Sequence, residues 1–97
     1  MTYPALELLL QAYLTLDWPD DYVDAWAAVD DFVANEPIAG QISGEVTELL
    51  KSNPCDDELR RLVVGELGSG YLPETDGWSM REWLDTLRQR VTEALGG

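Results

Sequence analysis

The residues with the clearest chemical potential in this sequence are four neighbouring aspartates, Asp17, Asp20, Asp21 and Asp24. Carboxylates in such a group could exchange protons with a substrate or bind a cation. Their spacing, however, does not match the D-x-D-x-D-G pattern of a calcium-binding loop. The sequence therefore predicts neither a metal nor a cofactor, and two interpretations of the acidic group remain. It is either a solvated surface without dedicated chemistry or a surface that faces a partner protein.

Nucleophilic catalysis lacks its usual components. The chain has no histidine, which removes Ser-His-Asp and Cys-His activation and the commonest general base near neutral pH. Cys55 is the single cysteine, and it precedes three carboxylates that oppose thiolate formation at a helix start. We interpret Cys55 as a small buried hydrophobic residue and predict that the protein is not an enzyme.

The net charge of −13 is distributed unevenly along the chain. Residues 1–50 carry ten acidic and no basic side chains, whereas residues 51–97 carry nine acidic and six basic ones. Binding to phosphates needs a basic footprint, so direct nucleic-acid binding is not expected. The same sign argues against an anionic membrane surface. A basic protein partner, by contrast, would be attracted and oriented by this field.

Length and apolar patterning predict one domain over residues 1–97. A chain of 97 residues can bury roughly 65% of its unfolded surface around a single core. No apolar run approaches the ~18 residues needed to span a membrane, and the first residues lack the basic n-region of a secretory signal. A single cysteine fits a reducing compartment, so we expect a cytoplasmic protein.

Apolar residues recur at helical spacing in five segments, and no segment alternates as a strand would. We expect helices over residues 4–16, 22–34, 36–51 and 80–95, and one that follows Asn53 and ends before Gly68. Short connections between them predict an all-α fold, a single compact bundle of four to five short amphipathic helices. Trp26 and Trp83 are expected in the core. The predicted core faces comprise Leu6, Leu9, Leu10, Tyr13, Leu14, Tyr22, Trp26, Val29, Phe32, Val33, Ile38, Ile42, Val46, Leu49, Leu50, Cys55, Leu59, Leu62, Val63, Leu67, Met80, Trp83, Leu84, Leu87, Val91 and Leu95.

Residues 67–84 contain the densest set of local signals. Gly68 stands where a helix C′ residue needs a positive φ, and residues 73–77 have the composition of a turn. Ser79 and Glu82 have the spacing of a capping box, and Trp78 and Trp83 occupy the hydrophobic-staple positions around it. We therefore expect this segment to anchor the last helix.

The same segment carries a family resemblance. Its pattern, Gly-x-x-Tyr-x-Pro-x-x-Asp-Gly-x-Ser-x-x-Glu-Trp-Leu from Gly68 to Leu84, resembles the C-terminal signature of contact-dependent growth inhibition immunity proteins. The pattern Leu-x-x-Leu-Leu-x-x-Tyr-Leu at residues 6–14, followed by Asp17-Trp18, is similar to their N-terminal part. Thr15-Leu16 and Ser69 depart from the expected His-Gln and Cys. The resemblance implies a small bacterial protein that binds and neutralises a cognate toxin C-terminal domain.

If that toxin is a nuclease, its active-site surface must be cationic to hold phosphates, and an acidic protein would mask it by steric and electrostatic means. We expect a monomer that forms a heterodimer with the toxin. The predicted toxin-binding residues are Asp17, Asp20, Asp21, Asp24, Asp30, Asp31 and Glu36.

Three alternatives remain. The acidic surface could instead serve a general interaction module or nucleic-acid mimic that binds a basic partner other than a toxin. Trp18 could be a loop plug or an exposed aromatic anchor. Gly40 and Gly44, on the polar side of their helix, could be a tolerated weak surface or a bare face that another segment or a partner approaches.

Overall fold

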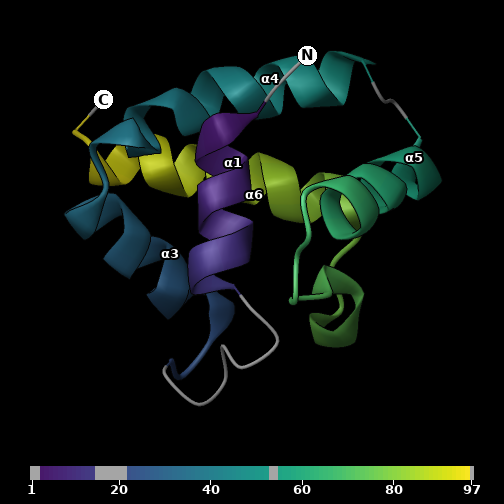
Figure 1. Ribbon diagram of the computed structural model, residues 1–97, viewed down its shortest axis with the longest axis horizontal. Coiled ribbons are helices and arrows are strands. Elements are labelled where there is room, and N and C mark those ends of the chain that lie inside the picture. The colour runs from purple at the N-terminus through teal and green to yellow at the C-terminus, as the bar shows by residue number, and fades with distance from the viewer. Residues whose placement is uncertain (1–2, 15–21, 53–54, 97) are drawn as a thin grey trace.

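The computed structural model describes residues 3–14, 22–52 and 55–96, and within these ranges all regular structure is helical (Figure 1). The predicted all-α class is therefore confirmed. The elements in chain order are α1 (Pro4–Leu8), the π-helix η1 (Leu9–Tyr13), α3 (Ala25–Asn35), the 3-10 helix η2 (Pro37–Gln41), α4 (Ile42–Ser52), α5 (Asp56–Arg60), the π-helix η3 (Arg61–Glu66), the 3-10 helix η4 (Pro73–Asp76) and α6 (Met80–Ala94).

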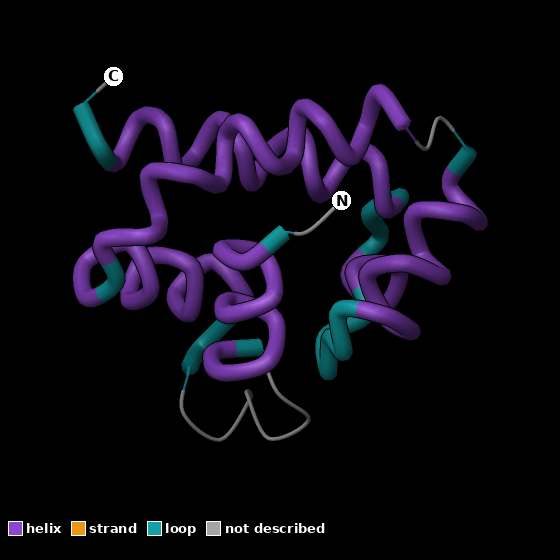
Figure 2. The backbone as a smooth tube through the Cα atoms, turned by 45° about the horizontal axis from the view of Figure 1, so that its top comes forward, coloured by secondary structure: helices purple, strands orange, loops and turns teal. Residues whose placement is uncertain are grey.

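The helices surround one cluster of buried apolar side chains. Helices α4 and α6 run alongside each other, α3 packs on α6, and α1 lies across this layer (Figures 1 and 2). The molecule measures 30 × 29 × 22 Å along its principal axes. Its largest fully buried side chains are Trp83, Phe32, Leu6, Leu9, Leu10, Leu14, Ile42, Leu49, Leu59, Met80, Leu84 and Leu87, so most of the predicted core faces are confirmed.

The first helix is shorter than the predicted 4–16, because it closes in a π-turn. The Leu14 amide donates to the Leu9 carbonyl (3.0 Å), and Leu14 itself leaves the helical region at φ −107°. Its carbonyl then accepts the Gly70 amide at 2.9 Å. A contact between segments distant in sequence thus takes the carbonyl that a continuing helix would have used.

Two other helix starts also differ from expectation. Helix α3 begins at Ala25 rather than residue 22, because the backbone of Asp24 is extended (φ −155°, ψ 174°). The predicted helix over residues 36–51 begins with the 3-10 turn η2 and becomes α-helical only at Ile42. Such tight turns are common at helix termini.

The anchoring segment forms largely as predicted. Gly68 and Gly77 have φ values of +76° and +87°, and the turn between the helices contains the short helix η4. The Ser79 hydroxyl accepts the Glu82 amide (3.1 Å) while the Glu82 carboxylate accepts the Ser79 amide (3.3 Å), which completes the capping box.

Ser69, where the family pattern suggests cysteine, has a clear structural role. Its buried hydroxyl donates to the Tyr71 carbonyl (2.8 Å) and accepts the Tyr71 amide (3.1 Å). These bonds satisfy both backbone groups of a residue that is only 2% exposed. The departure is therefore compatible with the same turn.

Several predicted core positions are exposed or only partly buried. Five of them pack against the core but remain partly exposed, namely Tyr13, Tyr22, Val33, Ile38 and Leu62. Cys55 is exposed, because α5 begins at Asp56 and leaves Cys55 as an extended N-cap residue; the predicted cap and first turn, Asn53 and Pro54, lie outside the described residues. Leu95 is 50% exposed because α6 ends one residue earlier, at Ala94. Trp26 packs against the core but is only half-buried.

The glycines at positions 68 and 44 give opposite predictions for alanine substitution. Gly68→Ala should destabilise the fold by about 1–2 kcal/mol, because a side chain disfavours the left-handed region; the added Cβ itself would meet only ordinary contacts with Gln11, at 3.5 Å. Gly44→Ala should stabilise by about 0.5–1 kcal/mol, because α4 gains helix propensity there. Urea unfolding of both variants measures the two changes in the free energy of unfolding. Equal changes would contradict the positive φ of Gly68.

No described atom lies within 4 Å of a Cβ built on Gly40 or Gly44. The described part of the chain therefore leaves both glycines uncovered, and approach by another described segment is ruled out.

Candidate toxin-binding surface

Three of the predicted toxin-binding aspartates, Asp24, Asp30 and Asp31, lie in the described part of the chain, and each is hydrogen-bonded within the fold. Asp17, Asp20 and Asp21 lie outside the described residues. The Asp24 carboxylate accepts the Ala27 amide at 2.8 Å and so caps α3. Although Asp24 is exposed, part of its hydrogen-bonding capacity serves the helix start.

Asp31 and Glu36 are both half-buried. The Tyr22 hydroxyl donates to Asp31 Oδ2 at 2.6 Å, and the Asn35 amide donates to Asp31 Oδ1 at 2.7 Å. Glu36 lies at the junction of α3 and η2, where its backbone amide donates to the Phe32 carbonyl (2.9 Å). Asp31 is therefore less exposed than its neighbour Asp30.

Asp30 is exposed on α3, and it is paired with Arg90 of α6. Arg90 Nε and Nη2 donate to the two Asp30 oxygens at 3.0 and 2.9 Å, a bidentate geometry. Hydrogen bonding to Asp30 is the main cause of the raised pKa of Arg90. Both side chains are about half exposed, so solvent screening limits the pair to ~1 kcal/mol or less.

The same arginine lies over an aromatic cluster. The Arg90 guanidinium carbon is 5.5 Å from the centre of the Trp26 ring, within the range of a cation–π contact. Trp26 stacks on Trp83 (5.8 Å between centroids) and meets Trp78 edge to face (5.9 Å). The two predicted staple residues, Trp78 and Trp83, are therefore joined through Trp26, whose participation local sequence rules did not predict.

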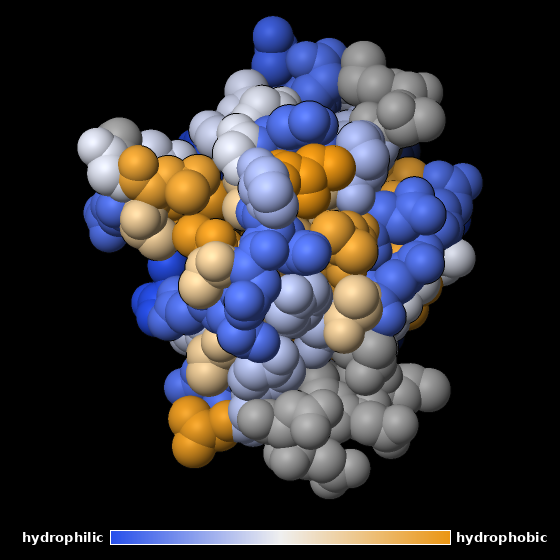
Figure 3. All heavy atoms as spheres, turned by 60° about the vertical axis from the view of Figure 1, so that its left-hand side comes forward, coloured by the Kyte–Doolittle hydropathy of each residue, from blue (hydrophilic) through white to orange (hydrophobic). Residues whose placement is uncertain are grey.

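These contacts place acidic, basic and aromatic side chains on one surface, which also includes an exposed valine. Val23 is 93% exposed directly before the α3 cap. We call this surface the α3 face and define it by Val23, Asp24, Trp26, Asp30, Trp78 and Arg90. Hydrophobic and hydrophilic residues alternate on the side of the molecule turned forward in Figure 3, the left-hand side of Figure 1, where α3 lies. Tryptophan and arginine are the residue types enriched in interface hot spots.

Two further carboxylates have structural roles that sequence analysis missed. Both Glu45 oxygens accept backbone amides of α1, from Ala5 and Leu6, each at 3.0 Å. Asp56 lies in the first turn of α5, and its oxygens also accept the amides of Met80 (3.2 Å) and Arg81 (3.1 Å) in α6. The sequence indicates only that the backbone amides at these two helix starts need acceptors. It does not show which of the many carboxylates accepts them.

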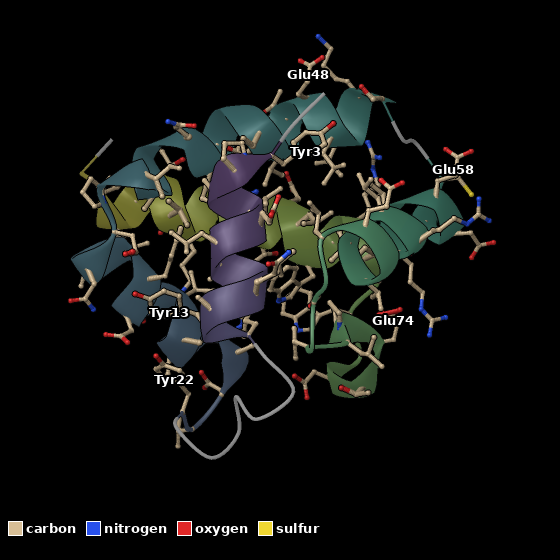
Figure 4. The ribbon with its side chains drawn as sticks, in the orientation of Figure 1. Tyr3, Tyr13, Tyr22, Glu48, Glu58 and Glu74 are labelled. Carbon is tan, nitrogen blue, oxygen red and sulfur yellow. The ribbon has the colours of Figure 1, made fainter. Side chains whose placement is uncertain are left out.

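The remaining acidic side chains are spread over several elements rather than gathered in one place. Figure 4 shows Glu48 on α4, Glu58 on α5 and Glu74 on η4 at separate edges of the molecule. Among the described residues no group of three or more His, Cys, Asp or Glu side chains is arranged to hold a metal ion. Within the same ranges no helix is long and apolar enough to cross a bilayer.

A family model described as CdiI immunity protein matches residues 2–91 of the chain. The match covers nearly the whole sequence, so the protein belongs to the CdiI immunity protein family, in agreement with the resemblance in its two motifs. It is accordingly a toxin-neutralising immunity protein whose partner is a cognate toxin. No curated protein and no solved structure matches the chain.

Proposed function

We propose that the α3 face, together with the acidic residues that precede it, binds a basic surface of the cognate toxin and masks it. The observation that carries this proposal is the charge asymmetry, with ten acidic and no basic residues in the first 50 positions. A field of that sign accelerates encounter with a cationic partner. The immunity protein then inhibits the toxin by steric and electrostatic masking, and this inhibition needs no catalytic step.

The α3 face also offers apolar contact area for the bound state. Val23 is 93% exposed, and the side chains of Trp26 and Trp78 are half-buried. Buried apolar and aromatic anchors supply most of the affinity of an interface, whereas peripheral charges mainly set the association rate. The combination supports a surface that attracts a basic partner and then retains it.

A nuclease is the toxin class that fits this charge best. An enzyme that cleaves nucleic acid must hold phosphates on a cationic surface, and an acidic inhibitor competes for that surface. The complex we propose is a one-to-one heterodimer formed in the cytoplasm, where a nuclease would meet its substrate.

Neutralising three aspartates tests the electrostatic part of this proposal. The triple variant Asp24→Asn, Asp30→Asn, Asp31→Asn keeps oxygen acceptors at all three positions, and asparagine caps a helix as well as aspartate does. We expect association with the toxin to slow about tenfold at low salt and much less at high salt, because screening already removes the steering. Stopped-flow or biosensor kinetics at two salt concentrations measures this.

A matched control removes the same charge elsewhere. Asp57→Asn, Glu58→Gln and Glu66→Gln change three exposed carboxylates on α5 and η3. If this control slows association equally, steering depends on total charge and the α3 face is not the site. Weak binding to many basic proteins, rather than tight binding to one toxin, would instead favour a general acidic module.

A further inference from the structure

The side chains of α4 and α6 line a groove of about 440 Å³ that gathers half of the basic residues of this acidic protein. Lys51, Arg81 and Arg88 line it, with Glu82 and Asp85 along the same walls and Leu50 and Thr47 from α4. A second hollow of about 380 Å³ shares Thr47 and Arg88 and extends along the same two helices. The predicted acidic surface does not include this groove.

The cations in the groove differ in whether they have partners. Arg88 donates to Thr47 Oγ1 at 3.2 Å and pairs with Asp85, so it holds the two helices together. Lys51 and Arg81 are exposed, and neither side chain has a hydrogen-bond or ion-pair partner among the described residues. Elsewhere in the described ranges, Arg60 pairs with Glu74 and Arg90 with Asp30; among the six basic residues, only Arg61 is also unpaired.

The carboxylates near Lys51 and Arg81 already have partners within the fold. Asp85 is compensated by Arg88, Glu82 completes the capping box, and Asp56 accepts the first amides of α6. The helix start is therefore already saturated, and attraction for an anion must come from the side chains of Lys51 and Arg81. A carboxylate approaching this protein meets a net charge of −13, and the two cations without partners in this groove oppose that repulsion locally.

We propose that the α4–α6 groove is a second docking site, which receives an acidic segment of the cognate toxin. The inference rests on the proposed function, since it assumes the toxin complex, but it concerns a different surface. A toxin would then be held at two points of opposite charge. A partner that is basic throughout would satisfy the α3 face and be rejected by Lys51 and Arg81, so the groove adds specificity among basic toxins.

The chain permits a direct chemical test, because Lys51 is its only lysine. Carbodiimide treatment of the purified toxin complex joins an amine to a carboxylate in contact with it. We expect mass spectrometry to find Lys51 linked to an aspartate or glutamate of the toxin. Lys51→Arg keeps the charge and should abolish this cross-link without weakening binding more than about threefold.

Charge reversal with a matched control gives the second readout. Arg81→Glu should raise the Kd of the toxin complex about tenfold or more, because it brings a carboxylate against an acidic segment. Arg61→Glu changes the net charge equally at an exposed position outside the groove, and we expect less than about a threefold effect. Circular dichroism of both variants checks that the fold is retained.

The outcomes separate the two proposals. Equal weakening by Arg61→Glu and Arg81→Glu, or a stable wild-type complex without a Lys51 cross-link, overturns the groove as a docking site and leaves the α3 face untouched. If wild-type protein binds no toxin, both proposals fail together. A Lys51 cross-link to a second copy of this chain, rather than to the toxin, also overturns the assignment of the occupant.

Discussion

Trp83→Ala is expected to lower the free energy of unfolding by about 3–5 kcal/mol, the range for large-to-small changes in a core. Trp83 is fully buried and lies between Trp26 and Tyr71, with ring centroids 5.8 and 5.5 Å away. Truncation would leave a cavity where these rings meet. Because small domains have only ~5–15 kcal/mol of stability, a large fraction of the variant should unfold at moderate temperature, as a thermal melt would measure.

Two controls sharpen this prediction. Leu95→Ala shortens an apolar side chain on the same helix, but Leu95 is half exposed, so we expect a loss below ~0.5 kcal/mol. Trp83 Nε1 is buried without a hydrogen-bond partner in the described structure. Trp83→Phe removes that unsatisfied donor and should therefore cost on the order of 1–2 kcal/mol, less than alanine. Equal melts for Trp83→Ala and Leu95→Ala would contradict the burial of the Trp83 ring.

The features predicted correctly from the sequence are those decided within a few residues. The capping box needs only Ser79 and Glu82 three residues apart, and Gly68 stands at a helix C′ position, where glycine is favoured because it adopts a positive φ without strain. Apolar spacing likewise identified the buried side of each helix. Such rules succeed because hydrogen bonds and side-chain directions inside one helix repeat at fixed intervals.

Helix ends that depend on distant residues could not be predicted in this way. The first helix stops where Gly70 donates to the carbonyl of Leu14, a contact between positions 56 residues apart in sequence. Gln11 reinforces the same junction by donating to the Leu67 carbonyl at 3.0 Å. Cys55 was misplaced for a related reason, since a shift of the helix start by a few residues moves a side chain from the inner face to the cap.

The candidate site was only partly predictable because charge count does not reveal which charges are already paired. The sequence places Asp24, Asp30 and Asp31 on one helix, but it does not show that the first caps that helix, the second meets Arg90 and the third receives Tyr22. The aromatic part of the α3 face was missed because Trp26 and Trp78 come from elements far apart in the chain. The basic groove was missed because its lysine and arginines come from different helices.

Glu45→Ala is expected to be the second most damaging substitution, with a loss of about 2–4 kcal/mol. The Glu45 carboxylate accepts two amides at the start of α1, and both residues that donate them, Ala5 and Leu6, are fully buried. Removing the acceptor leaves two donors without partners in a place that water reaches poorly, and each such group costs about 1–3 kcal/mol. Denaturant unfolding measures the total loss.

Glu48→Ala is the matched control, one turn further along α4. It removes the same charge from a half-buried carboxylate that has no hydrogen bond to the described residues, and it relieves repulsion in a chain of net charge −13. We expect it to be neutral or slightly stabilising. Hydrogen exchange adds a local readout, because Glu45→Ala should reduce protection of the Ala5 and Leu6 amides before the rest of the core. If those amides stay protected, α1 is held by its buried leucines alone, and the carboxylate that joins α4 to α1 is dispensable.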